Sequence, residues 1–296
     1  MRQYKFMSLS KEYSGKNTYF NILPIEYEKD LTFGKGASKG PAEIIKASKH
    51  LEYYDEQFDI EPFEKGILTL PALKLKDKRP EQAMQIISEA ILNHLDKKDK
   101  TQDRFLLSLG GDHSITIGIV KGLEQAYKDE NTGSFDVVIL DAHTDFFHSW
   151  NNSQFNHRCT AQRLISNHKI LQVGVRSMDK DEADLIRDND DINIIKAYDY
   201  NKDLLKQQLK HLKKNIYLSI DVDVFDISFI KNTGTPEPGG FFWNQMIGIL
   251  QIIFQEKNII SADIVEFSPN DNFEAESFAL AKLSYKLFAL KMINNS

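Results

Sequence analysis

The chain has 296 residues, of which 41% are hydrophobic and 27% charged, and it carries a formal net charge of −6 at pH 7. This composition is typical of a globular protein with a sizeable core. The acidic balance argues against nucleic acid as a partner, because phosphate binding needs a basic face. It is compatible with a cationic substrate.

Cys159 is the one cysteine of the chain, which excludes an intrachain disulfide and makes a reducing compartment the simplest expectation. The chain starts Met-Arg-Gln-Tyr-Lys-Phe, which lacks the apolar core of a signal peptide. No stretch approaches the roughly 18 apolar residues that a membrane span needs. We therefore expect a cytoplasmic protein with no membrane partner.

The N-terminal third carries signals for three elements. Residues 20–25 predict a strand, and residues 42–54 and 80–95 predict helices. The glycine-rich stretch 33–40 lacks the Gly-Lys-Ser/Thr ending of a phosphate loop, so we interpret it as a surface loop.

From residue 104 onward, apolar strand-like runs alternate with helical patterns. Strands are predicted over residues 104–109, 135–140, 169–175, 192–197, 215–220 and 259–265. Helices are predicted over residues 115–128 (with Ser114 as N-cap), 182–188, 202–213, 243–255 and 275–292. Such alternation predicts a three-layer α/β/α fold with a mostly parallel central sheet. No composition break marks a boundary, so residues 1–296 are expected to form a single domain.

Three short motifs rich in metal ligands each follow a predicted strand. They are Gly-Gly-Asp-His at 110–113, Asp-Ala-His-Thr-Asp at 141–145 and Ser-Ile-Asp-Val-Asp at 219–223. In parallel sheets, ligands bind beyond the carboxyl ends of the strands, so the three motifs should converge on one crevice. Alternate residues on an extended backbone point the same way, which would align the ligands within each motif.

Together the motifs supply two imidazoles and four carboxylates, which are too many for one small cation: His113, Asp141, His143, Asp145, Asp221 and Asp223. They suit two divalent cations about 3.5–4 Å apart, a pair that makes hydroxide from water near neutral pH. A single motif could be an ordinary polar loop, but the three together favour a metal-dependent hydrolase. The oxygen-rich ligand set favours Mn²⁺ over Zn²⁺.

Four further features could belong to the same crevice. His157 lies in a polar stretch and is either a surface-loop residue or a catalytic one. Glu266 follows a predicted strand and is either an ordinary strand-end acid or the partner of a planar cation. The loop 233–240, with two prolines and three glycines, predicts a rigid wall. Cys159 is interpreted as a small packed residue, because a two-metal hydrolase needs no thiol nucleophile.

These motifs resemble those of the ureohydrolase family, which includes arginase and agmatinase. The resemblance runs from Gly-Pro-Ala-Glu-Ile-Ile at 40–45 through the metal motifs to Asp-Ile-Val-Glu-Phe-Ser-Pro at 263–269 and the final helix. The most specific part is Ser-x-Asp-x-Asp followed by Gly-Thr-Pro-x-x-Gly-Gly. The resemblance implies an arginase-like fold, two Mn²⁺ per subunit, hydrolysis of a small cationic guanidino compound to urea and an amine, and a homotrimer or homohexamer.

The resemblance also implies a role for each residue. His113 would bind one manganese and His143 the other, Asp141 and Asp221 would bridge, and Asp145 and Asp223 would complete the two shells. A metal-bridging hydroxide, hydrogen-bonded to Asp145, would attack the guanidinium carbon. Glu266 would pair with the guanidinium, Thr235 would line the substrate pocket, and His157 would bind beside the leaving amine and give it a proton.

The substrate that the resemblance favours is agmatine, whose products would be urea and putrescine, as in polyamine biosynthesis. Glu237-Pro238 resembles agmatinase, and Phe155 stands where arginases place an Asn that holds the substrate carboxylate. Asp179 is a weak match to the acid that contacts the substrate amine in the family. Other amidinohydrolase activities stay open: guanidinobutyrase, guanidinopropionase, guanidinase, arginase or formiminoglutamase.

Two departures from the family pattern bear on these expectations. Ile227 replaces the proline usual after Asp226, and Arg158-Cys159 follows His157 where agmatinases usually carry glycine. The second departure alters the pocket-side loop and so concerns the substrate more than the catalysis. The alternative outside enzymes is a catalytically silent homologue that acts as a binding or assembly subunit.

Overall fold

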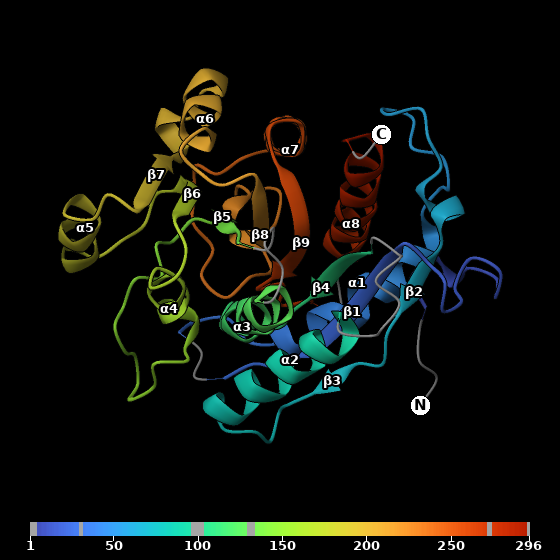
Figure 1. Cartoon of the computed structure of the whole chain (residues 1–296), viewed down its shortest axis with the longest axis horizontal. Helices are drawn as coiled ribbons and strands as arrows, with labels where there is room; N and C mark the ends of the chain where they lie inside the picture. The colour runs from blue at the N-terminus through green and yellow to red at the C-terminus, as the bar shows by residue number, and fades with distance from the viewer. Residues whose placement is uncertain (1–4, 30–31, 96–103, 129–133, 271–273, 295–296) are drawn as a thin grey trace.

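A parallel β-sheet forms the centre of the molecule (Figure 1). The computed structural model describes residues 5–29, 32–95, 104–128, 134–270 and 274–294. In sheet order the strands are β2 (Ile67–Thr69), β1 (Phe20–Glu26), β4 (Phe105–Leu109), β9 (Asn258–Val265), β8 (Asn215–Asp221), β5 (Asp136–Leu140), β6 (Ile170–Val175) and β7 (Ile192–Lys196), while β3 (Leu73–Lys74) pairs with β1. Each pairing between these strands is parallel, which confirms the predicted fold class.

Helices cover both faces of the sheet. One layer contains α1 (Gly40–Ala47), α6 (Lys202–Leu209), α7 (Trp243–Glu256) and α8 (Ala275–Asn294). The other contains α2 (Pro80–Leu95), α3 (Ile115–Tyr127) and α4 (Thr160–Leu164), and α5 (Lys180–Arg187) packs at its edge. In Figure 1, α6, α7 and α8 lie above the sheet and α2, α3 and α4 below it. Short 3₁₀ helices span Phe6–Ser8, Ala37–Lys39, Ser48–His50, Pro62–Lys65, His157–Cys159, Ala197–Asp199 and Val222–Val224.

Alternate side chains of each central strand enter two separate hydrophobic cores. In β5, Val138 and Leu140 pack with the layer of α7 and α8, whereas Val137 and Ile139 pack with the layer of α2 and α3. Successive residues of a strand point to opposite faces, so a sheet covered on both sides needs apolar residues at every position. This is why the strands are continuous apolar runs in the sequence.

The predicted strands are present with bounds within one residue of the prediction, but some helix predictions are wrong. The helix predicted over 42–54 ends at Ala47, followed by the turn Ser48–His50. There the Ser48 hydroxyl donates to the Ile45 carbonyl and accepts from the Met7 amide, which ties this end to the N-terminal segment. The helix predicted to reach Lys213 ends at Leu209.

Ser114 does not cap α3 with its side chain, contrary to the prediction. Its own backbone is already helical, and its hydroxyl donates to Asp112 instead. The short strands β2 and β3 and the five-residue helix α4 were not predicted, because elements of this length carry too few residues for a periodic pattern.

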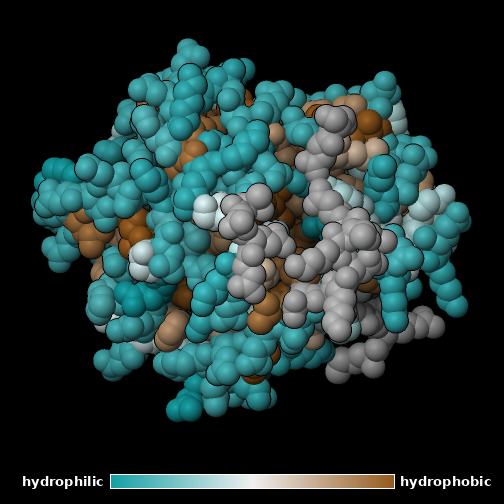
Figure 2. Space-filling model, in the orientation of Figure 1, coloured by the Kyte–Doolittle hydropathy of each residue, from teal (hydrophilic) through white to brown (hydrophobic). Residues whose placement is uncertain are grey.

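Within the described residues, no helix is long and apolar enough to cross a bilayer. The face drawn in Figure 2 is mostly hydrophilic, and its apolar residues form small separate groups.

Strands β4, β9, β8 and β5 are consecutive in the sheet, so their carboxyl ends lie side by side. At the end of β4, Gly111 is in close contact with Tyr27: the Asp112 amide donates to the Tyr27 carbonyl at 3.0 Å. A Cβ at Gly111 would lie 1.6 Å from that carbonyl oxygen. Only glycine allows this backbone contact, which fixes the position of the residues that follow.

We predict that Gly111→Ala lowers the free energy of unfolding by about 1–3 kcal/mol, because the backbone of one of the two segments must shift. Gly248→Ala is the matched control: it lies inside α7 with no neighbouring atom within 4 Å of an added Cβ, and it should be neutral or stabilising. Denaturant unfolding of both variants measures the difference. Equal midpoints would contradict the role of Gly111.

Candidate metal centre and catalytic pocket

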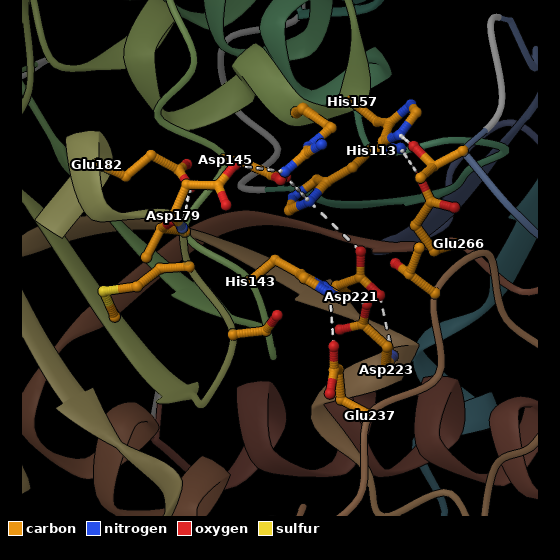
Figure 3. Close-up of a pocket in the computed structure, with 16 residues that line it drawn as sticks. His113, His143, Asp145, His157, Asp179, Glu182, Asp221, Asp223, Glu237 and Glu266 are labelled. Atoms are coloured by element: carbon orange, nitrogen blue, oxygen red, sulfur yellow. Dashed lines mark hydrogen bonds and ion pairs between the residues drawn. The ribbon is translucent and has the colours of Figure 1, made fainter.

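One pocket of about 230 Å³ at the carboxyl ends of the central strands brings the three sequence motifs together (Figure 3). His113 follows β4, His143 and Asp145 follow β5, and Asp221 and Asp223 follow β8. All five line the pocket, together with six other residues that the sequence singled out: His157, Arg158, Asp179, Thr235, Glu237 and Glu266. Asp141 lies immediately beneath, fully buried at the end of β5.

The imidazoles and carboxylates meet in two groups that share one residue. His113 Nδ1 lies 3.1 Å from Asp141 Oδ2, 3.1 Å from Asp145 Oδ2 and 3.4 Å from Asp221 Oδ2. His143 Nδ1 lies 2.9 Å from Asp223 Oδ2 and 3.7 Å from Asp141 Oδ1. Asp141 therefore directs one oxygen to each group, which is the arrangement of a carboxylate that bridges two cations.

The ligands converge through turns, not through an extended backbone, so the predicted alternation within each motif is wrong. Asp145 has a positive φ of 54°, and Asp223 lies in the 3₁₀ turn Val222–Val224. Asp221 accepts the Asp223 amide at 2.9 Å, and Asp141 accepts the His143 amide at 2.6 Å. These local hydrogen bonds close each motif into a tight turn with its carboxylates facing inward.

A buried hydrogen-bond network fixes the orientation of His113. His113 Nε2 lies 3.0 Å from Ser219 Oγ, and the Ser219 hydroxyl donates to Asp263 Oδ1 at 2.6 Å. Thr116 and Tyr217 also donate to Asp263. Because the Ser219 hydrogen is directed to Asp263, Nε2 must donate its hydrogen to Ser219. Nδ1 then faces the carboxylates, where it can hold either a proton or a metal ion.

Burial and mutual repulsion shift the pKa values of the acids and imidazoles in this cluster. Burial raises the pKa of Asp221 well above its usual range, and Asp223 and Asp141 add to the shift. Burial raises the pKa of Asp145 to about 6. Burial alone would lower the pKa of His143, but Asp223 and Asp141 raise it to about 12. Burial thus favours the protonated forms of Asp145 and Asp221, and the carboxylates favour the protonated form of His143.

The donor set fits divalent metal ions. His113 Nδ1 and Asp141 Oδ2 are buried and make no hydrogen bond, although they lie 3.1 Å apart. Two ligand groups, one of His113, Asp141 and Asp221 and the other of Asp141, His143 and Asp223, have ligand atoms within 4.8 Å of one another. A buried carboxylate oxygen and a buried imidazole nitrogen that face each other without a hydrogen bond are what a cation site requires.

Glu266 lies beside this cluster at the end of β9, at a positive φ of 66°. Its Oε1 accepts the His113 amide at 2.7 Å. Burial raises its pKa well above the usual range, with Asp112 adding to the effect. Gly234 of the loop 233–240 passes so close that an added Cβ would lie 2.8 Å from Glu266 Oε2. In the same loop, Glu237 Oε1 lies 3.6 Å from His143 Nε2.

His157 begins the 3₁₀ turn His157–Cys159 and lines the pocket. Its Nε2 lies 2.8 Å from Thr32 Oγ1, whereas its Nδ1 is buried without a hydrogen-bond partner. Burial, assisted by the positive charges of His113 and Arg158, lowers its pKa to about 4, so the ring is neutral at neutral pH. Burial raises the pKa of the Cys159 thiol to about 11, which leaves it protonated and unsuited to nucleophilic attack.

Three residues that position the pocket were missed in the sequence. Arg176 donates to the carbonyls of Asp223 at 2.6 Å and Glu237 at 2.9 Å, so it ties a metal motif to the loop 233–240. It directly follows β6, so the strand-end rule that found the metal motifs could have found it. Glu182 accepts the amides of Phe146 and Asp179, both at 2.9 Å. Thr32 lies in a loop and had no sequence signal.

Comparison with known proteins identifies the family. The family model described as the arginase family matches residues 19–289. The N(1)-aminopropylagmatine ureohydrolase of Thermus thermophilus is 34% identical over 273 residues, which cover 91% of this chain and 89% of the relative. The agmatinase of Pyrococcus horikoshii is 30% identical over 276 residues, with 93% of each chain covered.

Solved structures show the same fold. The agmatine ureohydrolase of Thermoplasma volcanium superposes with a TM-score of 0.82 at 22% identity, covering 99% of this chain and 95% of that one. The formimidoylglutamase of Bacillus subtilis gives a TM-score of 0.83 at 22% identity, with 99% and 92% covered. Because the family model spans most of the sequence and relatives are at least 30% identical along nearly its whole length, this chain belongs to the arginase family and is a hydrolase of the ureohydrolase type.

Proposed function

We propose that this enzyme hydrolyses the guanidino group of agmatine to urea and putrescine and uses two Mn²⁺ per chain. The observation that carries the proposal is the convergence of two imidazoles and four carboxylates on one pocket beside the buried acid Glu266. The names of the relatives, N(1)-aminopropylagmatine ureohydrolase and agmatinase, support an aminoalkyl guanidine as the substrate.

The residues would hold the metals in two overlapping sets. His113 and Asp145 would bind one cation, His143 and Asp223 the other, and Asp141 and Asp221 both. When bound, such a pair of divalent cations lowers the pKa of a shared water and supplies hydroxide near neutral pH. The preponderance of carboxylate ligands supports manganese over zinc.

Glu266 would bind and orient the guanidinium. Its carboxyl is buried and has a raised pKa, and a guanidinium placed beside it would favour the ionised form. A carboxylate and a planar guanidinium form two parallel hydrogen bonds, which fix the plane of the guanidinium. The bond from the His113 amide to Glu266 Oε1 holds the carboxylate next to the ligand cluster. Glu266 thus presents the face of the guanidinium carbon to the metals.

His157 would pass a proton to the leaving amine. A ring with a pKa of about 4 is neutral at pH 7, so it acts as a relay between its two nitrogens and not as a standing acid. With the Thr32 hydroxyl donating to Nε2, Nδ1 is the nitrogen that carries a hydrogen, and it is free of other partners for the departing nitrogen of the substrate. As Nδ1 gives up its proton, the Thr32 hydroxyl would donate a proton to Nε2, and solvent in the pocket would return one to Thr32.

The proposed substrate is tested by urea release from manganese-loaded protein with agmatine, arginine, 4-guanidinobutyrate, 3-guanidinopropionate and guanidine. We expect agmatine to exceed arginine in kcat/KM by at least about tenfold, because no Asn is available two residues before His157 for the α-carboxylate. Urea release from agmatine no faster than from arginine would overturn the substrate assignment. Full metal loading with no urea from any compound would favour the silent homologue.

Asp221→Ala should abolish metal loading and activity together. The variant loses a carboxylate assigned to both cations, and the remaining imidazoles and acids keep their protons instead. Metal content after manganese loading and desalting is the measurement. Asp179→Asn is the control, because Asp179 lines the same pocket away from the ligand groups. Retention of both metals by Asp221→Ala would contradict the assignment.

Loss of the relay should slow turnover while leaving both metals in place. We expect His157→Ala to lower kcat by about 10²-fold or more and Thr32→Val by about tenfold, the size of one lost hydrogen bond. Thr32→Ser keeps the hydroxyl and should stay near wild type. Adding Thr32→Val to His157→Ala should change nothing further, because the two residues act in one path. Additive losses would show that Thr32 acts independently of His157.

A further inference from the structure

An arginine, Arg158, is held at the pocket beside the predicted catalytic residue His157. The Arg158 guanidinium carbon lies 4.2 Å from the ring centroid of Phe147 and 4.1 Å from that of Trp150. The two rings contact each other at 5.0 Å between centroids, and the Phe147 amide donates to the Arg158 carbonyl at 3.0 Å. Stacking on two aromatic rings favours this orientation of the Arg158 side chain over one extended into solvent.

The same guanidinium reaches Asp179. Arg158 Nη2 lies 3.4 Å from Asp179 Oδ2, and the Asp179 side chain is 61% exposed while that of Arg158 is 27% exposed. Both residues line the pocket. The neighbouring acid Glu182 is buried, and its two oxygens accept the amides of Phe146 and Asp179. Of these two neighbouring acids, Asp179 is therefore the one open to an incoming cation.

Asp179 is placed to meet the far end of a substrate. Figure 3 shows Asp179 and Glu266 on opposite sides of the pocket, with His143 and Asp221 between them. If the guanidinium group of a substrate bound at Glu266, the alkyl tail of that substrate could extend across the pocket toward Asp179. Agmatine carries an ammonium at the end of that tail, and Arg158 already lies beside the carboxylate that would receive it.

We propose that Arg158 is a specificity-determining residue that competes with the distal ammonium of the substrate for Asp179. The inference rests on the proposed function, because it takes the guanidino group to lie at Glu266. A positive charge fixed next to Asp179 repels an incoming ammonium and attracts a carboxylate. Arg158 therefore weakens the preference for cationic over anionic tails that Asp179 alone would give.

Arg158→Gln tests this with three tails of similar length: agmatine (cationic), n-butylguanidine (neutral) and 4-guanidinobutyrate (anionic). We expect kcat/KM for agmatine to rise about fivefold and that for 4-guanidinobutyrate to fall about fivefold, the size typical of a partly exposed charge pair. The difference between the tails should lie in KM, because Arg158 also helps to lower the pKa of His157, and a change there would alter kcat for all three compounds alike. The neutral tail should respond least.

Arg158→Lys is the matched control, because it keeps the positive charge and loses planar stacking, and it should keep the wild-type order of preference. In the Arg158→Gln background, Asp179→Asn should remove the gain with agmatine. A fall in kcat/KM for agmatine in Arg158→Gln would overturn the proposal, since Arg158 would then be ordering Asp179 for the ammonium. Parallel changes in KM with all three compounds would also overturn it, because they indicate a structural role.

Binding of the same three compounds to the manganese-loaded proteins, measured by calorimetry, separates the two proposals. If the wild type binds them but releases no urea from any, the proposed function fails. The Kd values of Arg158→Gln and wild type then decide the role of Arg158 alone: opposite shifts for the cationic and anionic tails support it, and equal shifts reject it.

Discussion

The centre of this protein is governed by the repulsion among carboxylates that the fold buries together. Asp141, Asp145, Asp221 and Asp223 are all buried within one small volume. Ionised carboxylates in such surroundings are strongly destabilised unless positive charge lies between them. Burial accordingly raises the pKa of Asp145 and Asp221, and the neighbouring carboxylates raise the pKa of His143. Bound divalent cations would neutralise the carboxylates in place of protons and would lower the pKa of a shared water.

The fold brings these carboxylates together because they lie at or just after the ends of neighbouring parallel strands. The parallel order β4-β9-β8-β5 places the ends of separate sequence segments next to one another. Bonds behind the cluster then hold each element in register: Ser219 and Asp263 orient His113, and Arg176 links Asp223 to the loop that carries Glu237. Arg158 and Asp179 line the same pocket but belong to neither ligand group.

The sequence predicted the sheet well because buried parallel strands are continuous apolar runs. It predicted that the three candidate metal motifs would meet because polar residues directly after such runs share one edge of the sheet. The sequence-based predictions were wrong where contacts of individual residues determine a helix end, a turn or a cap. The Ser48 side chain ties the end of α1 to the N-terminal segment, Asp145 takes a left-handed turn, and Ser114 bonds to Asp112 instead of capping α3. Thr32 could not have been found, because its contact with His157 joins residues 125 apart. The metal, the catalytic roles and the oligomeric state stay predictions.

The central claim is that the carboxylate cluster holds two cations that share ligands. Its most direct test is titration of metal-free protein with Mn²⁺, followed by electron paramagnetic resonance. We expect two bound equivalents of Mn²⁺ per chain. Once the second equivalent is bound, the spectrum should be that of a spin-coupled pair, because Asp141 directs one oxygen to each ligand group. One bound equivalent, or two with the spectra of isolated ions, would contradict a shared binuclear site.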